Sequence, residues 1–200
     1  CVMDATFGPY AGKETGETAL LREMLDSFDN GDVLVADRYH CSFMMIALLM
    51  ERGVDTCICM HQRRHVDFRR GRRLGKYDHL IEWSRPAKTK WMEEQTYTNI
   101  SERMTHREFR FQVVGNRRRM ETIAELYGHR WSSELDLRCI KQTLNLDHMR
   151  CKTPAMVRKE LWTTLLAYNL IRRVICVAAL EHGMQPRRIS FARTCETLLA

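Results

Sequence analysis

The chain has 200 residues, of which 44% are hydrophobic and 28% are charged, and it carries a formal net charge of +7. This length is enough for one domain with a sizeable core, and the positive charge favours polyanionic partners such as nucleic acid. The first residues lack a basic segment followed by an apolar run, which argues against a secretory signal. The longest apolar stretch, 165–180, contains two arginines and is too short for a bilayer, so a soluble protein without membrane contact is predicted.

Helix and strand signals alternate in the first quarter of the chain. Residues 17–28 have the apolar spacing of an amphipathic helix, and the apolar run 33–36 is typical of a buried parallel strand. Asp37 follows that strand directly. Open α/β sheets place functional groups at the carboxyl ends of their strands, although a turn aspartate that merely ends the strand fits equally well. Residues 42–52 predict a second helix, which Gly53 ends.

From residue 54 to residue 114 the pattern changes to strand-like alternation. The alternating segments are 55–61, 79–83 and 107–114, with polar loops between them. The densest basic run of the chain also lies here and consists of Arg63, Arg64, Arg69, Arg70, Arg72, Arg73 and Lys76. Such a run can neutralise DNA phosphates without reading sequence, but a solvated basic loop explains it equally well.

Aromatic and metal-ligating residue types in the same region have two interpretations each. Trp83 and Trp91 can pack in the core, as most tryptophans do, or stack on an unpaired base. Possible zinc ligands are Cys57, Cys59, His61 and His65. The first three alternate as residues on one face of a strand do, and no second cysteine pair follows, which favours a structural role. The eight cysteines do not predict a disulfide framework, because no secretory signal precedes them.

The region after residue 117 predicts two helices, the second over 157–182. In the first helix four polar side chains fall on one stripe: Tyr127, Arg130, Glu134 and Lys141. At 3.6 residues per turn they lie within a wedge of about 60° along about 21 Å of helix. A carboxylate flanked by two cations and a phenol suits a polyanion with a metal ion at its reacting phosphate. Ordinary ion pairs on a solvated helix face are the simpler explanation.

The spacing of these four residues resembles the signature of the insertion sequence four family of bacterial DDE transposases, which includes the transposase of transposon five. Other stretches similar to the family are Gly12–Thr18, Val33–Tyr39, Leu135–Leu144, Asp147–Pro154 and Val157–Trp162. The resemblance covers nearly the whole chain. It implies an α/β fold with a ribonuclease-H-like core, which is also the core of retroviral integrases.

The resemblance also implies a division into three parts. Residues 1–53 correspond to the N-terminal part of the catalytic core and contain the strand that leads to Asp37. Residues 54–116 correspond to a β-rich insertion, and residues 117–200 to the C-terminal helical part of the core, which carries Glu134.

The activity implied by the resemblance is cut-and-paste transposition, that is, metal-dependent phosphodiester hydrolysis and strand transfer at transposon ends. In the family two aspartates and a glutamate hold two Mg²⁺ or Mn²⁺ ions about 3.5–4 Å apart. Asp37 matches the second aspartate and Glu134 the glutamate, so these two are the expected catalytic and metal-binding residues. Tyr127, Arg130 and Lys141 match residues that hold DNA phosphates beside the cut.

The expected partner is double-stranded DNA at transposon ends, with a homodimer possible in a synaptic complex. The arginines expected to contact this DNA from the basic run are Arg69, Arg70, Arg72 and Arg73. The expected location is the bacterial cytoplasm, in association with the nucleoid.

The sequence departs from the family pattern at the first catalytic aspartate. In the family this residue lies within an Asp-Gly-Thr tripeptide on the opening strand, and the tripeptide does not occur here. A strand and its connection are also missing around 115–119. The chain is therefore expected to be an N-terminally incomplete fragment that is inactive in isolation. A noncatalytic DNA-binding or interfering fragment is the alternative to a transposase that needs its missing portion.

Overall fold

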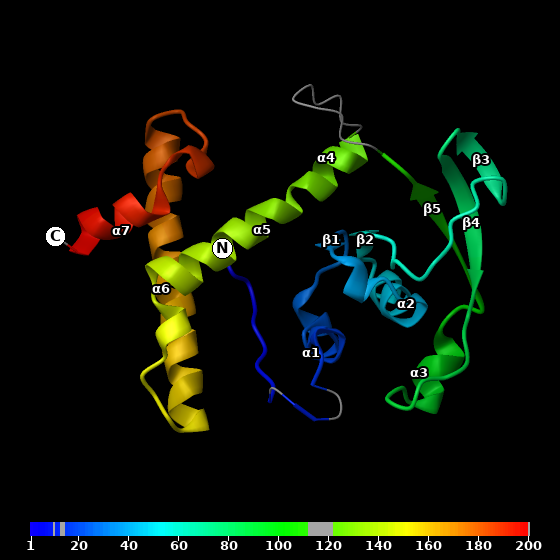
Figure 1. The fold of residues 1–200 in the computed structure, drawn as a ribbon, viewed down its shortest axis with the longest axis horizontal. Coiled ribbons are helices and arrows are strands. Elements are labelled where there is room, and N and C mark those ends of the chain that lie inside the picture. Colours follow the sequence, from blue (N-terminus) through cyan, green and yellow to red (C-terminus); the bar gives the residue numbers. More distant parts are fainter. Residues whose placement is uncertain (10, 13–14, 112–121, 200) are drawn as a thin grey trace. The chain divides into compact units, whose positions relative to one another are not determined.

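The computed structural model describes residues 1–9, 11–12, 15–111 and 122–199. It shows a mixed α/β chain with one two-stranded and one three-stranded sheet in these ranges. The chain forms two compact units, one of Gly8–Arg130 and one of Cys1–Phe7 with Trp131–Ala200, and Figure 1 labels their helices and strands. The expected division at residues 53 and 116 stays a prediction, and its second boundary lies outside the described residues.

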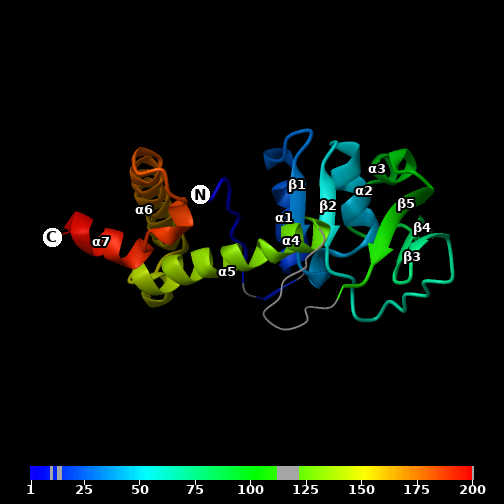
Figure 2. The same cartoon turned by 90° about the horizontal axis from the view of Figure 1, so that it is seen from above.

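The first sheet joins β1 (Val33–Ala36) and β2 (Asp55–Ile58) as parallel neighbours, as Figure 2 shows. The connection is α2 (Phe43–Glu51), whose first seven residues are all buried, so this helix forms the core of the larger unit. Ser42 caps it by accepting a hydrogen bond from the backbone N–H of Met45 at 3.3 Å. The predicted strand at 33–36 and the predicted helix at 42–52 are thus confirmed.

Two sequence expectations in this unit need correction. The sequence predicts that segment 55–61 belongs to the inserted β-region, but its first four residues pair with β1, because α2 is long enough to carry the chain back to a parallel neighbour. The expected helix at 17–28 is shorter: α1 spans Glu17–Glu23 and is followed by a 3-10 turn at Leu25–Ser27. Gly53 ends α2 with a φ of 71°, where an added Cβ would lie 2.0 Å from Asn30 Oδ1.

The second sheet is antiparallel, in the order β3–β4–β5. Its strands are β3 (Arg72–Gly75), β4 (Asp78–Ser84) and β5 (Arg103–Phe109), and the helix α3 (Glu94–Asn99) lies in the connection between the last two. The strand predicted at 79–83 is confirmed. The strand predicted at 107–114 begins earlier than expected, and its last three residues lie outside the described residues, as does the segment 115–119.

The region of the signature does not form one unbroken α-helix, which corrects the sequence expectation. It consists of α4 (Thr122–Gly128), α5 (Arg130–Arg138) and a π-helical turn at Cys139–Thr143. Gly128 is a poor helix former and ends α4, with His129 as the turn residue between the two helices. The π-turn closes with a bond from Leu144 N–H to the carbonyl of Cys139 at 3.1 Å. The structure therefore lacks the single ideal α-helix on which the sequence predicts one stripe of four residues.

The smaller unit packs the π-turn against α6 (Pro154–Glu181) and α7 (Phe191–Leu199), and α5 is joined to α6 by the ion pair between Asp136 and Arg172. Thr153 caps α6 and Pro154 stands at its start, where a missing N–H costs nothing. The core of this unit consists of Ile140, Leu165, Tyr168, Ile175, Phe191 and Cys195. The remaining short turns are 3-10 helices at Arg38–His40, Leu146–His148 and Pro186–Arg188.

The expectation about the membrane rested partly on length, and that part is wrong. Stretch 165–180 belongs to α6, which has 28 residues and is the one helix in the described residues that is long and apolar enough to cross a membrane. Core helices of soluble proteins pass the same test. A row of apolar side chains on α6 is half exposed or more, including Leu166, Leu170 and Leu180.

Candidate active site

Asp37 lies where the sequence predicts it, directly after β1 at the carboxyl end of the parallel pair. It caps the 3-10 turn Arg38–His40, because its Oδ1 accepts a hydrogen bond from the backbone N–H of Tyr39 at 2.9 Å. Within the described residues its second oxygen has no hydrogen-bond partner. Asp37 is half-buried, so one carboxylate oxygen is held in place by the backbone and the other is available to a ligand.

Tyr127 reaches the same edge of the sheet from α4. Its phenol interacts with Cys59, the residue that follows β2 and whose N–H bonds the carbonyl of Ala36 at 3.4 Å. Burial first, and the Cys59 thiol second, raise the pKa of Tyr127, against the opposing effect of Arg130. The guanidinium of Arg130 lies 5.8 Å from the centre of the Tyr127 ring. The Tyr127 phenol therefore keeps its proton and can donate a hydrogen bond to an anion.

Glu134 and Lys141 belong to the other compact unit, on α5 and on the π-turn, and both are exposed. Helix α5 is anchored through Asp136, whose carboxylate pairs with Arg172 at 2.7 Å and with Arg187 at 2.9 Å. Burial opposes ionisation of Asp136, but its hydrogen bonds, led by that from Arg187, keep its pKa below the ordinary value. The approach of Glu134 to Asp37 stays a prediction.

The four arginines of the basic run that are expected to contact DNA differ in their surroundings. Arg69 forms a two-pronged pair with Asp67, at 2.9 and 3.2 Å, and these bonds lower the pKa of Asp67 to about 2. Arg70, Arg72 and Arg73 are exposed, the last two on β3. Gly71 between them has a φ of 71°, and an added Cβ there would lie 2.1 Å from the carbonyl oxygen of Leu80. The loop is therefore shaped by close packing on β4, while three of its guanidinium groups face solvent.

A buried polar network in the second sheet escaped the sequence interpretation. His79 stands opposite Glu108 in the β4–β5 register, and its Nε2 lies 3.1 Å from the Glu108 carboxylate. Trp83 Nε1 donates to the same carboxylate at 2.9 Å, and His106 Nε2 lies 3.1 Å from it. His79 Nδ1 is 2.7 Å from the carbonyl oxygen of Arg70. The sequence signal for this network was the alternation of side chains between the two faces of β4 and β5, which places these polar residues on the inward face.

This network decides the role of one tryptophan. Trp83 is only 8% exposed and is held by Glu108, so a base-stacking role for it is wrong in this structure. Trp91 is half-buried at the rim of a pocket. All eight cysteines are free, and within the described ranges no three His, Cys, Asp or Glu side chains lie close enough together to hold a metal ion. The zinc interpretation therefore gains no support.

Comparison with known protein families gives a match that covers most of the chain. Residues 9–170 match the family model described as the transposase DDE domain. The chain therefore belongs to the transposase DDE domain family.

One curated relative is the transposase InsG for insertion sequence element IS4 of Escherichia coli strain K12. The two chains are 26% identical over 205 residues, an alignment that covers 95% of this chain and 46% of InsG. The chain thus spans about half the length of this curated relative, and no solved structure matches it. The resemblance to the insertion sequence four transposases is confirmed at the level of the family.

Proposed function

We propose that these 200 residues form part of a transposase that cuts and joins DNA at transposon ends by a cut-and-paste reaction. The observation that carries the proposal is the position of Asp37 at the carboxyl end of a parallel strand pair, inside the stretch that matches the transposase DDE domain. We assign β1 and β2 to an incomplete ribonuclease-H-like core. The β3–β4–β5 sheet then lies in the insertion expected over 54–116, between core parts 1–53 and 117–200, except that the insertion begins after β2, because β2 pairs with β1.

Asp37 and Glu134 are the residues proposed to hold Mg²⁺ or Mn²⁺. Carboxylate oxygens are the ligands that these hard cations prefer, and Asp37 offers one oxygen that is not committed to a partner within the described residues. The metal, when bound, supplies an activated oxygen nucleophile and stabilises the leaving oxygen. The protein orients the proposed metal ligands. The backbone N–H of Tyr39 fixes the orientation of Asp37, and the ion pair between Asp136 and Arg172 fixes α5, which carries Glu134, against α6.

Tyr127, Arg130 and Lys141 are proposed to hold the DNA phosphates beside the cut. The protonated phenol of Tyr127 and the guanidinium of Arg130 provide hydrogen-bond donors from adjacent positions on α4 and α5. Charge-assisted bonds of this kind position the backbone without reading its sequence.

The isolated 200-residue chain is expected not to nick a supercoiled plasmid in Mg²⁺ or Mn²⁺. Two carboxylates without a third leave one metal position under-coordinated. Gel electrophoresis of the plasmid after incubation measures this. Nicking that disappears in both Asp37→Ala and Glu134→Ala would contradict the expected dependence on a further carboxylate.

Binding to duplex DNA is expected to be weak, insensitive to sequence and steeply dependent on salt. Each neutralised phosphate contributes about 0.9 to the slope of log affinity against log salt concentration. Replacing Arg69, Arg70, Arg72 and Arg73 together with alanine should flatten the slope by about three units. Arg72→Ala or Lys141→Ala alone should flatten it by about one unit, and Arg69→Ala by less, because Asp67 already pairs with Arg69.

Titrations at several salt concentrations measure these slopes. An affinity indifferent to salt, or unchanged by the fourfold substitution, would show that the run is a solvated loop.

The alternative function is that of a noncatalytic DNA-binding or interfering fragment. It is favoured by one observation, the absence of an Asp-Gly-Thr tripeptide from the 200 residues. In either case we propose that the chain acts on bacterial DNA in the cytoplasm, at the nucleoid, and associates as a homodimer in a synaptic complex. The plasmid assay, repeated with a complete transposase of the family added, distinguishes the two proposed functions. An interfering fragment should lower the activity of the added enzyme.

A further inference from the structure

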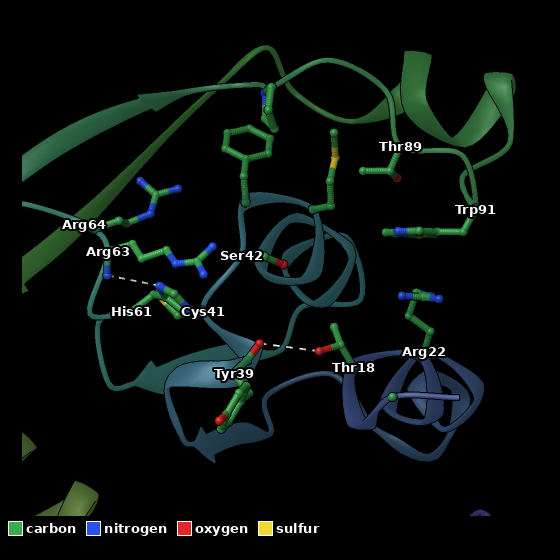
Figure 3. Close-up of a pocket in the computed structure, with 15 residues that line it drawn as sticks. Thr18, Arg22, Tyr39, Cys41, Ser42, His61, Arg63, Arg64, Thr89 and Trp91 are labelled. Carbon is green, nitrogen blue, oxygen red and sulfur yellow. Dashed lines mark hydrogen bonds between the residues drawn. The ribbon is translucent and has the colours of Figure 1, made fainter. Parts of the chain in front are cut away.

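A pocket of about 700 Å³ lies in the larger compact unit, and its lining includes Arg63 and Arg64 of the basic run but none of Arg69, Arg70, Arg72 and Arg73. Figure 3 shows that it is bounded by α1, the start of α2, the segment after β2 and the loop before α3. Three arginines line it, Arg22, Arg63 and Arg64, together with the hydroxyl groups of Thr18 and Thr89. No aspartate or glutamate belongs to its lining in the described part of the chain. The pocket is therefore strongly cationic.

Two of these arginines rest on tryptophan rings. The guanidinium of Arg22 lies 4.0 Å from the centre of the Trp91 ring, and that of Arg64 lies 3.6 Å from the centre of the Trp83 ring. Trp83 is itself fixed by its bond to Glu108. A stacked guanidinium presents its N–H edge sideways, in the geometry that binds phosphate oxygens. The tryptophans thus restrict the motion of the two cations before any ligand arrives.

The same contact argues against the base-stacking role considered for Trp91. The ring face toward Arg22 is already covered by the guanidinium, and Figure 3 shows Arg22 lying flat against Trp91 at one end of the pocket. A base cannot occupy that face without displacing the cation. The phosphate groups of a nucleic acid, and not its bases, are what these residues are arranged to meet.

Further donors point to the same chemistry. The Oγ1 of Thr89 is buried and has no hydrogen-bond partner within the described residues. The pocket also includes the first residues of α2, a nine-residue helix whose N-terminus carries partial positive charge. Burial raises the pKa of the Cys41 thiol in the lining, so this group adds no negative charge.

We propose that this pocket binds successive phosphate groups of one polyphosphate chain, such as the backbone of a single DNA strand. Arg63 and Arg64 lie on one side of the pocket and Arg22 on the opposite side, so a single phosphate ion does not satisfy both sides. The guanidinium groups of Arg22 and Arg64 bind the phosphates, and Trp91 and Trp83 hold these two guanidinium groups in position. The inference rests on the DNA-binding function proposed above and adds a subsite separate from Asp37, Glu134 and the arginines on β3.

The test measures equilibrium binding in a chelator, without any divalent metal, so that its outcome is independent of the metal site. The probes are a labelled single-stranded oligonucleotide, the same oligonucleotide with abasic sugars, and inorganic tripolyphosphate. The variant is Arg63→Ala with Arg64→Ala. The matched control is Arg158→Ala with Lys159→Ala, which removes the same charge from exposed positions of α6, outside the pocket.

The pocket variant is expected to lose affinity for the oligonucleotide by about tenfold or more, whereas the control should change it by less than about twofold. Abasic and normal strands should bind equally well. Trp91→Ala should weaken binding severalfold, and Trp91→Phe should restore much of it, because a phenyl ring still supports Arg22. If tripolyphosphate binds and its binding depends on the same arginines, a small polyphosphate is also a ligand of the pocket. If tripolyphosphate does not bind, the DNA strand is the ligand.

Three outcomes would overturn the proposal. One is equal loss in the pocket variant and the control, which would show that only net charge matters. Another is strong discrimination against the abasic strand, which would show that a base occupies the pocket. The third is a lack of binding of all three probes to the unmodified chain.

Discussion

Glu108→Ala is expected to lower the free energy of unfolding by about 3–5 kcal/mol, the range observed when one partner of a buried ion pair is removed. Glu108 is 8% exposed and His79 is fully buried. Both nitrogens of His79 face oxygens, one of Glu108 and one of the Arg70 carbonyl. Without the carboxylate, His79 Nε2 and the N–H of Trp83 would remain buried without their partner.

Chemical denaturation of both proteins at neutral pH measures this effect. Glu102→Ala is the matched control, since its side chain is 86% exposed and its contact with Arg85 is long, at 3.8 Å. That variant should change the free energy of unfolding by less than about 0.5 kcal/mol. A loss of similar size in the two variants would show that the network is not a major stabilising element.

The stability of the protein is expected to depend on pH through the same carboxylate. Burial opposes ionisation of Glu108, but the hydrogen bonds from His106, His79 and Trp83 together hold its pKa below the ordinary value. Its contribution to stability is therefore fully present above the pKa of the unfolded chain and is lost as pH falls through the lower pKa of the folded state. Glu108→Ala should remove that part of the acid-induced loss of stability.

The elements that could be predicted from the sequence are those with strong local signals. The run 33–36 is continuously apolar, and the α2 segment is almost entirely Leu, Met, Ile, Phe and Ala, so both elements are recognisable. Only α2 is largely buried, because in β1 Ala36 alone is buried and Val33 is 47% exposed. Asp37 was predictable as a candidate metal ligand because it follows this recognisable strand. The final helix α7 was missed, although Phe191 and Cys195 carry the four-residue spacing of a buried helical face.

The features that could not be predicted depend on contacts between distant residues. The partner of β2 follows from the crossover of α2, and not from the alternation of residues 55–61. Glu108 and His79 are separated by 29 positions, and nothing in either strand specifies that pairing. Gly128 in the sequence indicated the break between α4 and α5, but the spacing of the four signature residues favoured one continuous helix. The secondary structure around a single residue was thus easier to predict than the contacts between distant residues.

Loss of either proposed metal ligand is expected to weaken Mn²⁺ binding at least about 100-fold, because removal of groups that merely orient ligands already costs about 10–100-fold. The variants are Asp37→Asn and Glu134→Gln, which keep the shape of each side chain while removing its charge. Asp55→Asn, at an exposed position at the start of β2, is the control and should bind Mn²⁺ as the unmodified chain does. Electron paramagnetic resonance of free Mn²⁺ measures the affinities.

The most direct test of the proposed active site replaces Mg²⁺ with Fe²⁺ and lets the bound iron cut the polypeptide in the presence of ascorbate and peroxide. Hydroxyl radicals formed at one site cut the backbone next to the residues that hold the metal. If Asp37 and Glu134 bind the metal together, mass spectrometry of the fragments should show cuts near both residues. Excess Mg²⁺ should suppress both cuts, and both should vanish in either Asp37→Asn or Glu134→Gln. Cuts near only one of the two residues, or a cut near residue 37 that persists in Glu134→Gln, would contradict a shared metal site.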